Sequence, residues 1–233
     1  RYKAVKKFDL FIPVSKSINE FYKEYLTGPQ CVYLPLCIDK VDHEDAKFDT
    51  NQVTVMGRLS SEKAYDDMLR VFVKVLEQNP SAHLNIVGDG EERHNLSVLA
   101  DRLGIADSVT FYGNKVGKEK SQILEKTSVF VTTSHYESFG LVLLEAMDYG
   151  IPCLSFDSAK GSLDIIEDGK DGYIIKNRDL DQMANKLVEL LNNPSKELSK
   201  NAKDKANSYS YENVRKQWLD AFKNMNIHDL KTR

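Results

Sequence analysis

The sequence has little that would assign the chain to a membrane, a nucleic acid or a metal. Its longest apolar runs fall well short of the roughly 18 residues that a membrane span needs, so we expect no transmembrane segment. Its 32 basic and 35 acidic residues nearly cancel, which leaves no field that would attract nucleic acid. The 5 histidines lack the spacing of metal ligands, and no Asp-x-Asp motif directly follows a predicted strand, so we expect no metal site.

Cysteine is also scarce. The three cysteines, Cys31, Cys37 and Cys153, are an odd number, and each lies in an apolar segment. A cysteine in such a segment behaves as a small buried hydrophobic residue. The sequence therefore predicts buried thiols in a reducing compartment, and we expect the protein in the cytoplasm.

A long alternation of predicted strands and helices starts at residue 52. Short β-branched or apolar runs are separated by segments with apolar residues at helical spacing. The predicted strands are residues 52–57, 82–88, 108–113, 128–133, 151–156 and 173–176, and the predicted helices are residues 61–78, 91–103, 118–126, 140–150, 161–167, 179–192 and 195–207. This order predicts an α/β fold with a doubly wound parallel sheet (Rossmann-like), in which ligands bind at the carboxyl ends of the strands.

The two ends of the chain have other patterns. An apolar strand is predicted at 8–14, and Ser15 is expected to cap a helix over residues 16–26. A second apolar run follows at 31–36, and the polar segment 39–51 has the composition of a linker. A last amphipathic helix is predicted over residues 210–225.

The most informative stretch is VTTSHYESFGLVLLEAMDYG, residues 131–150. It connects a buried strand through a polar turn to a helix N-terminus, whose unpaired N–H groups attract phosphate or sugar oxygens. Glu137 lies in the turn and Glu145 inside the helix. Eight residues of helical rise would separate them by roughly 12 Å, whereas the acid/base pair of a glycosidase needs about 5–9.5 Å. The spacing favours an elongated ligand with one carboxylate at each end.

The same stretch resembles a known family signature. Glu137, seven intervening residues and Glu145, with Phe139-Gly140-Leu141 between them, resemble the motif of retaining glycosyltransferases of the GT-B fold, and more narrowly of glycosyltransferase family 4. The resemblance implies that Glu137 contacts the donor sugar and that Glu145 contacts the ribose. It also implies that backbone amides of the intervening residues contact sugar or phosphate, which makes Ser138, Phe139, Gly140 and Leu141 donor-binding residues.

A second motif, Gly57-Arg58-Leu59-Ser60 with Lys63 five residues after Arg58, follows the strand predicted at 52–57. A guanidinium and an ammonium beside a helix N-terminus can neutralise a diphosphate, although an ordinary solvated helix turn has the same composition. The family pattern implies that Gly57, Arg58 and Lys63 hold the donor diphosphate. The family usually has glycine after that lysine, whereas this chain has Ala64, whose methyl group restricts the approach of the backbone to a ligand.

Other positions carry weaker signals. We expect the Gly88-Asp89-Gly90 turn to clear space for ligand, and the resemblance implies that backbone atoms near Val116 contact the nucleotide base. Residues 158–164 either shape the sugar pocket or form an ordinary surface loop. We interpret His135 as a polar loop residue, and Ser138 as a turn residue because it lacks the G-x-S-x-G context of a nucleophile.

The resemblance implies a division of the chain into parts. Residues 1–38 would be the tail of a missing N-terminal acceptor-binding domain, and residues 39–51 the linker. Residues 52–208 would be the nucleotide-sugar-binding domain, the C-terminal half of a GT-B fold, and residues 209–233 a crossover helix. The chain begins at Arg1 rather than Met, so we expect a piece of a longer protein that binds donor and transfers little by itself.

The implied function is that of the donor-binding part of a retaining glycosyltransferase, which moves a hexosyl group from a UDP-linked sugar to an acceptor hydroxyl. Arg58, Lys63 and Glu137 would be catalytic, without a cofactor or metal. The acceptor would be a glycan or glycolipid bound through the missing domain, in bacterial surface polysaccharide or glycolipid synthesis. The full protein would contact the inner face of the membrane peripherally.

Two alternatives remain open at this stage. A non-catalytic nucleotide-binding α/β module is compatible with the balanced charge and the lack of a complete acid/base set. A nucleotide-sugar epimerase or a phosphorylase is less favoured, because no further acid/base cluster and no lysine in a Schiff-base context is present.

Overall fold

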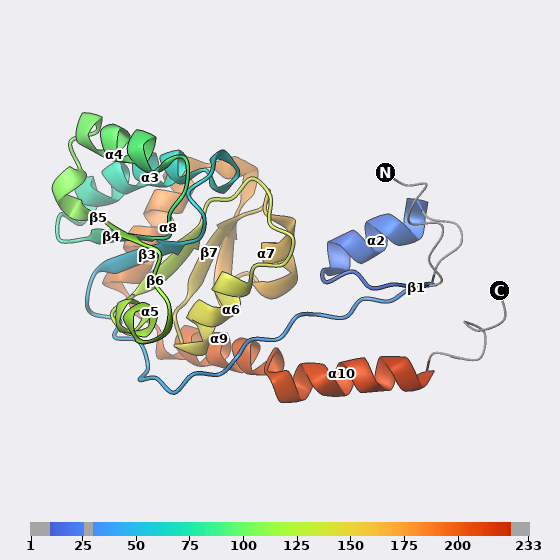
Figure 1. Ribbon diagram of the computed structural model, residues 1–233. Coiled ribbons are helices and arrows are strands. Elements are labelled where there is room, and N and C mark those ends of the chain that lie inside the picture. Colours follow the sequence, from blue (N-terminus) through green and yellow to red (C-terminus); the bar gives the residue numbers. More distant parts are fainter. Residues whose placement is uncertain (1–9, 26–29, 225–233) are drawn as a thin grey trace.

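The computed structural model describes residues 10–25 and 30–224, arranged as Figure 1 shows. A parallel six-stranded sheet lies at the centre, with strands in the order β5-β4-β3-β6-β7-β8. The strands are β3 Gln52–Met56, β4 His83–Val87, β5 Val109–Gly113, β6 Val129–Thr132, β7 Cys153–Phe156 and β8 Gly172–Ile175. The predicted α/β fold with a doubly wound parallel sheet is confirmed.

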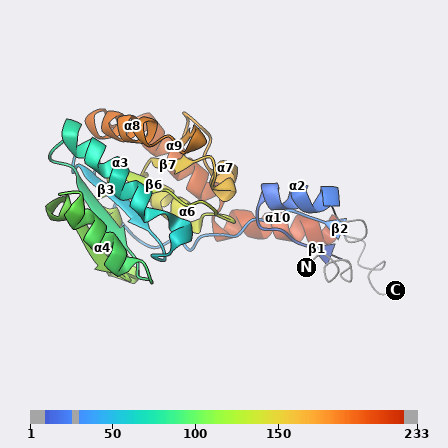
Figure 2. The same cartoon turned by 90° about the horizontal axis from the view of Figure 1, so that it is seen from above.

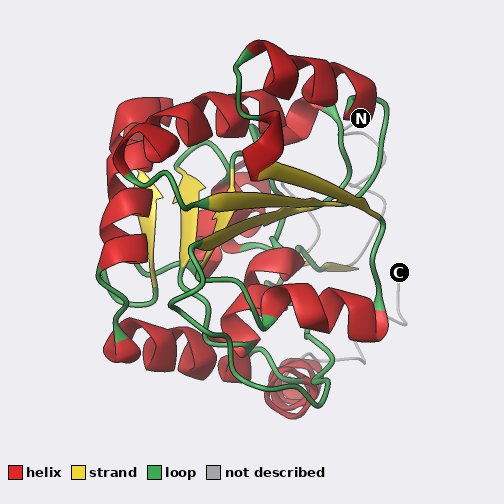
Figure 3. Cartoon of the chain, turned by 90° about the vertical axis from the view of Figure 1, so that its left-hand side faces the viewer, coloured by secondary structure: helices red, strands yellow, loops and turns green. Residues whose placement is uncertain are grey.

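Helices cover both faces of this sheet (Figures 2 and 3). They are α3 Tyr65–Gln78, α4 Arg93–Arg102, α5 Gly117–Leu124, α6 Leu141–Asp148, α7 Lys160–Ile165, α8 Leu180–Asn192 and α9 Lys196–Ser208, with short 3₁₀ helices η1 Ser61–Lys63, η2 Ala106–Ser108 and η3 Lys176–Arg178. Because successive strand residues face opposite sides, Val129 and Val131 pack with α3, α4 and α8, whereas Phe130 packs with α5, α6, α7 and α9. Within residues 10–25 and 30–224, every helix is too short or too polar to span a bilayer.

The strand order reverses between β3 and β6. Strand β3 pairs with β4 on one side and with β6 on the other, and later strands are added outward to β5 and to β8. Ligands of doubly wound sheets bind at such a reversal, beside the carboxyl ends of the two central strands. The two sequence motifs leave the sheet at this place, one after β3 and one after β6.

An arm projects from one side of the α/β unit (Figures 1 and 2). It consists of β1 Leu10–Phe11, α2 Lys16–Tyr25, β2 Gln30–Cys31, the segment up to residue 36, and α10 Tyr211–Asn224. The predicted cap of α2 is confirmed, since the Ile18 amide donates to Ser15 Oγ at 3.2 Å. The Lys16 amide also donates to the carboxylate of Asp164, on α7, at 2.6 Å, so the α/β unit helps to cap a helix of the arm.

The strands of the arm are shorter than expected. Residues 8 and 9 of the strand predicted at 8–14 lie outside the described residues, as do residues 26 and 225 of the two predicted helices and residues 226–233. After β2, the Val32 and Leu34 amides still donate to the Phe11 and Pro13 carbonyls at 3.1 and 3.2 Å. Pro13 and the later proline at 35 have no N–H to donate, which limits pairing in both predicted runs.

The predicted linker, residues 39–51, packs closely on the α/β unit in spite of its polar composition. The ring of His43 stacks on Tyr149, with centroids 3.6 Å apart, and its Nε2 lies 3.0 Å from Asp148 Oδ2. The buried Ala46 donates its amide to the Tyr149 carbonyl at 3.0 Å. The segment is therefore held against the end of α6.

The helix predicted over residues 61–78 is not continuous. Helix η1 ends at Lys63, Ala64 has a left-handed backbone with φ 48° and ψ 46°, and α3 begins at Tyr65. The periodic apolar residues that suggested one helix all belong to α3. Because Ala64 turns the chain, Lys63 belongs to η1, in the loop at the carboxyl end of β3, and not to α3.

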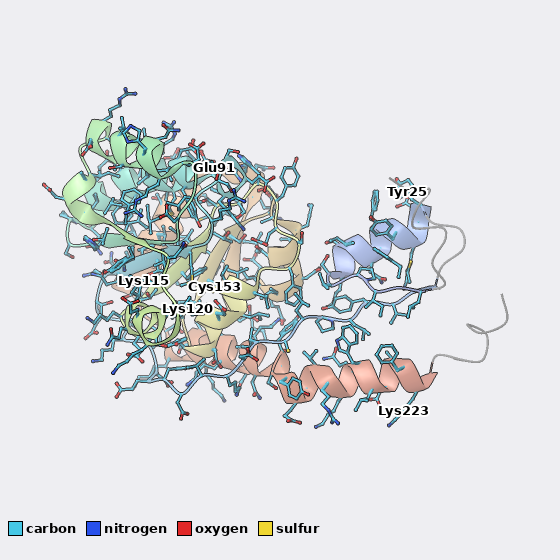
Figure 4. The ribbon with its side chains drawn as sticks, in the orientation of Figure 1. Tyr25, Glu91, Lys115, Lys120, Cys153 and Lys223 are labelled. Carbon is cyan, nitrogen blue, oxygen red and sulfur yellow. The ribbon has the colours of Figure 1, made fainter. Side chains whose placement is uncertain are left out.

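The cysteines agree with the sequence only in part. Cys153, labelled on β7 in Figure 4, is fully buried, and this burial raises the pKa of its thiol well above the usual range. Cys31 and Cys37 are only partly buried, because they lie in or next to the arm and not in the core of the sheet.

Candidate functional site

The β3 loop, residues 57–64, is positioned by the backbones of its neighbours. The Gly57 amide donates to the Val87 carbonyl at 2.9 Å, and the Leu59 amide donates to the Asp89 carbonyl at 3.0 Å. The Glu92 amide returns a hydrogen bond of 2.9 Å to the Leu59 carbonyl. The Leu59 side chain is fully buried, so the loop is fixed at both main-chain and side-chain level.

The expected role of the glycine turn after β4 needs correction. A Cβ on Gly88 would lie 1.9 Å from the Gly57 carbonyl oxygen, and a Cβ on Gly90 would lie 2.3 Å from that of Leu59. Both glycines therefore let the β3 loop pack against the turn. The space that they leave is occupied by protein backbone and not by a ligand.

Arg58 and Lys63 have different surroundings in the β3 loop. The Arg58 side chain is 75% exposed, and its Nη2 lies 3.3 Å from Glu91 Oε2, also an exposed group. Figure 4 labels Glu91 at the end of the sheet where this loop lies. An exposed pair of this kind contributes only about 0–1 kcal/mol, so the Arg58 guanidinium can leave Glu91 for another anion.

Lys63 pairs with Glu137. Its Nζ lies 2.7 Å from Glu137 Oε2, and both side chains are mostly buried. The Thr133 hydroxyl donates to the Lys63 carbonyl at 2.9 Å, and the His135 amide donates to the Glu62 carbonyl at 2.8 Å. The phosphate-binding candidate from the β3 loop and the sugar-binding candidate from the turn after β6 are thus in direct contact.

We call residues 134–140, which connect β6 to α6, the β6 turn. Gly140 ends it with φ 99°, a left-handed conformation that glycine adopts without strain. In the described chain, no backbone or side-chain acceptor bonds the amides of Gly140, Leu141 and Val142, so these donors are available at the N-terminus of α6. Phe139 is buried and packs edge-on against Tyr209, which leaves its backbone but not its side chain for ligand contact.

Glu145 lies one turn into α6 and points towards α5. Its Oε1 lies 3.2 Å from the Nζ of Lys120, and both side chains are partly exposed. Figure 4 labels Lys120 on α5. The separation of roughly 12 Å between Glu137 and Glu145 was estimated from helical rise, but Glu137 precedes α6 and this rise applies only from Leu141 onward. The separation of the two carboxylates therefore also depends on the conformation of the β6 turn.

The two glutamates open into separate clefts. Glu137 lines a cleft of about 390 Å³ with Tyr136 and Ser138 of the turn, Lys160 of α7 and the α2 face of the arm. Glu145 lines a second cleft of about 300 Å³ with Leu141, Lys120 and the linker. The N-terminus of α6 lies between the two glutamates in sequence, and the two clefts share no lining residue.

A comparison with protein families identifies the chain. The family model described as glycosyl transferases group 1 matches residues 39–208, which is most of the sequence. The chain belongs to the group 1 glycosyl transferases. The matched residues include the β3 loop, the β6 turn and α6.

Two curated relatives are similar to this group 1 chain over most of its length. An uncharacterized glycosyltransferase of Haemophilus influenzae is 31% identical over 74% of this chain and 49% of its own length. A poly(ribitol-phosphate) alpha-N-acetylglucosaminyltransferase of Staphylococcus aureus is 28% identical over 78% of this chain and 38% of its own length. The chain therefore spans about half the length, or less, of these relatives.

A solved structure supports the fold. The crystal structure of a mutant of S. aureus TarM, in complex with fondaparinux, alpha-GlcNAc-glycerol and UDP, superposes with a TM-score of 0.85. The superposition covers 96% of this chain and 45% of that chain, at 23% sequence identity. The fold of the group 1 chain is thus that of a GT-B glycosyltransferase domain, with a parallel sheet of six strands.

The structure brings most predicted site residues to one edge of the sheet. Gly57, Arg58 and Lys63 follow β3, and Glu137 to Leu141 follow β6, while Val116 lies after β5 with a 78% exposed side chain. Their roles as donor-binding residues stay a prediction.

Sequence reasoning missed Arg178. Its guanidinium donates to the Ser158 hydroxyl at 2.9 Å and to the Ser134 carbonyl at 3.4 Å. The Lys-Asn-Arg sequence that ends at Arg178 contains no motif, so only the three-dimensional contacts could reveal this residue.

Proposed function

We propose that this chain is the donor-binding part of a retaining glycosyltransferase of the family 4 kind. The whole enzyme would move a hexosyl group from a UDP-linked sugar to an acceptor hydroxyl. One observation carries the proposal: Glu137, just before α6, and Glu145, inside α6, line two different clefts, with Lys63 beside the first glutamate.

The geometry supports one orientation of the donor. The diphosphate would lie at the N-terminus of α6, where the available amides of Gly140, Leu141 and Val142 and the helix dipole favour a negative charge. The sugar would extend towards Glu137 and the ribose towards Glu145. The base would reach the loop after β5, near Val116. The UDP in the TarM structure supports a uridine nucleotide.

Binding of the nucleotide sugar would replace the ion pair of Lys63 and Glu137 with a contact from Lys63 to the diphosphate and a contact from Glu137 to the sugar. The ligand-free site already pairs Lys63 with Glu137 at 2.7 Å. A diphosphate would attract the Lys63 ammonium, and a sugar hydroxyl would donate to the Glu137 carboxylate in its place. Both side chains stay in polar contact throughout, so neither charge is left buried without a partner.

The proposed chemistry is electrostatic. When the bond between the sugar C1 and the phosphate oxygen breaks, negative charge develops on the leaving diphosphate. Lys63 and the exposed, reorientable Arg58 would stabilise that charge together with the α6 amides. Two cations and a helix N-terminus can do this without a metal ion.

The acceptor would enter from the side of the arm. The cleft that contains Glu137 is bounded there by Ile18, Phe21 and Tyr22 of α2. By analogy with the S. aureus poly(ribitol-phosphate) alpha-N-acetylglucosaminyltransferase, we propose a bacterial surface polymer or glycolipid as the acceptor class. Since nucleotide sugars are made in the cytoplasm, we place the reaction there, at the inner face of the membrane.

Isothermal calorimetry with UDP, UDP-glucose, UDP-N-acetylglucosamine and ATP tests the proposal. We expect a preference for one UDP-sugar, and a loss of about tenfold or more in its affinity, roughly 1.4 kcal/mol, in Glu145→Ala and in Arg58→Ala. Binding of ATP as tightly as a UDP-sugar, with no effect of these substitutions, would favour a non-catalytic nucleotide-binding module.

A further inference from the structure

Two ion pairs connect the β3 side of the site to the β6 side. Lys63 pairs with Glu137, and Arg178 of η3 pairs with Asp67 in the first turn of α3. Asp67 comes four residues after Lys63, and Arg178 donates to the carbonyl of Ser134, three residues before Glu137. Through its added bond to Ser134, Arg178 therefore connects the start of α3 to the β6 turn, close to the segments that the pair of Lys63 and Glu137 connects.

The two pairs differ in what a donor would do to them. Lys63 and Glu137 are proposed to bind the donor, so their mutual contact is given up when it enters. Neither Arg178 nor Asp67 lines the clefts that contain Glu137 and Glu145. The pair of Arg178 and Asp67 can therefore remain formed in the donor complex, whereas the pair of Lys63 and Glu137 cannot.

The contacts of Arg178 are unusually many for one side chain. Besides Asp67, the guanidinium bonds Ser134 and Ser158 and lies 4.6 Å from the ring centroid of Phe156. Ser158 also donates to the Ser134 carbonyl at 3.2 Å. A planar guanidinium can donate in several directions at once, and a lysine ammonium at the same place cannot reproduce that geometry.

The backbone around Arg178 is strained as well. Asn177 and Arg178 are successive residues with φ of 57° and 51°. Left-handed backbone at non-glycine residues persists only where surrounding contacts over-determine it, and such positions cluster at functional sites. Here those contacts come from α3, the β6 turn and the end of β7.

We propose that Arg178 is a positioning residue that keeps the β6 turn in register with the β3 loop while the donor separates Lys63 from Glu137. The inference rests on the proposed function, because it takes UDP-sugar as the ligand. It predicts that Arg178 matters for the sugar, which Glu137 contacts, and little for UDP, which the β3 loop, the α6 amides and Glu145 hold.

The test measures, by calorimetry, the affinities of Arg178→Lys and Asp67→Asn for UDP and for a UDP-sugar. The UDP-sugar is UDP-glucose or whichever one the wild type prefers. We expect each variant to weaken the UDP-sugar at least fivefold and UDP less than twofold. Lys74→Ala is the matched control, since Lys74 of α3 also forms an ion pair, with Asp181 at 2.6 Å, away from the site. Equal loss for both ligands, or loss for neither, overturns the proposal. If Arg178→Lys does not fold, Asp67→Asn decides.

Hydrogen exchange of the ligand-free protein separates this proposal from the proposed function. The His135 and Gly161 amides report on the turn, because they donate to Glu62 and Glu137 carbonyls at 2.8 Å. We expect their exchange to be at least tenfold faster in Arg178→Lys and unchanged in Lys74→Ala. Unchanged exchange in Arg178→Lys overturns the positioning role. Absence of any UDP-sugar binding by the wild type overturns the proposed function.

Discussion

The β3 loop and the β6 turn leave adjacent strands at the same edge of the sheet, yet they are held in different ways. Main-chain hydrogen bonds to the turns after β4, together with Gly88 and Gly90, fix the β3 loop. The β6 turn is also held by main-chain hydrogen bonds, from His135 to Glu62 and from Gly161 to Glu137, but the side chains of Arg178, Ser158 and Lys63 add further contacts to it. The first segment should be most sensitive to an added Cβ at its neighbours Gly88 and Gly90, whereas the second should also be sensitive to substitution of the polar side chains that hold it.

The largest effect is expected for Gly88→Ala. The new Cβ would lie 1.9 Å from the Gly57 carbonyl oxygen, so the β3 loop would have to move. We expect a loss of about 3 kcal/mol or more in the free energy of unfolding, measured by urea denaturation. Gly104→Ala is the control, because it also has positive φ but nothing within 4 Å of its Cβ. Equal losses in the two variants would show that the main chain does not hold the loop.

The next effect concerns Lys63→Ala, which removes the contact between the two segments. We expect UDP-sugar affinity to fall about tenfold or more, roughly 1.4 kcal/mol, because the diphosphate loses a cation. The free energy of unfolding should also fall, by about 1–3 kcal/mol, because the mostly buried Glu137 is left without its cation. Calorimetry and urea denaturation of the same variant measure both quantities. Unchanged UDP-sugar affinity in a folded variant would contradict the assignment.

The substitution Ala64→Gly tests whether the left-handed backbone of the β3 loop is strained. Glycine relieves about 1–2 kcal/mol of left-handed strain, and it loses about 0.8 kcal/mol of methyl burial plus about 0.4–1 kcal/mol of unfolded-state entropy. We therefore expect a net change within about 0.8 kcal/mol. The matched variant Ala184→Gly, at a buried position inside α8, should cost about 1.5–2 kcal/mol. Equal costs in urea denaturation would argue against strain at Ala64.

The smallest effect is expected for the pH dependence of stability through His83, which lies outside both segments at the amino end of β4. Burial lowers the pKa of His83, whose Nε2 lies 2.8 Å from Thr110 Oγ1. Below its usual pKa of about 6.5, the unfolded chain binds the proton more readily than the folded chain, so stability falls as the pH falls through this window. We expect His83→Gln to lose less thermal stability than the wild type between pH 7.5 and pH 5.5. The UDP-sugar affinity of His83→Gln should equal that of the wild type. A lower affinity in the variant would link this end of the sheet to the site.

Much of the architecture followed from pattern alone. Strands such as Val129–Thr132 are short and apolar on both faces because helices cover the sheet on both sides, and their alternation with amphipathic helices leaves few other folds. The carboxyl-end rule then placed the motifs that contain Lys63 and Glu137 together, and their 2.7 Å contact agrees with it.

The rest could not be predicted because it depends on contacts between distant residues. Periodicity predicted one helix over residues 61–78, since it cannot detect that Ala64 turns the chain before the apolar stripe begins. Polar composition predicted a linker over residues 39–51, but it could not show that the stacking of His43 on Tyr149 holds this segment against the α/β unit. Arg178 belongs to no motif, and its partners lie 20, 44 and 111 residues away in the sequence.

The two places where the main chain passes between the arm and the α/β unit are joined to each other. The Ile38 amide donates to the Tyr209 carbonyl at 3.0 Å, and residues Ile38 and Ser210 form a parallel bridge. Because the Lys16 amide also donates to Asp164 of α7, the arm is attached to the α/β unit at two separate places. Any change in the width of the Glu137 cleft, which α2 bounds, would have to break the contact between Lys16 and Asp164.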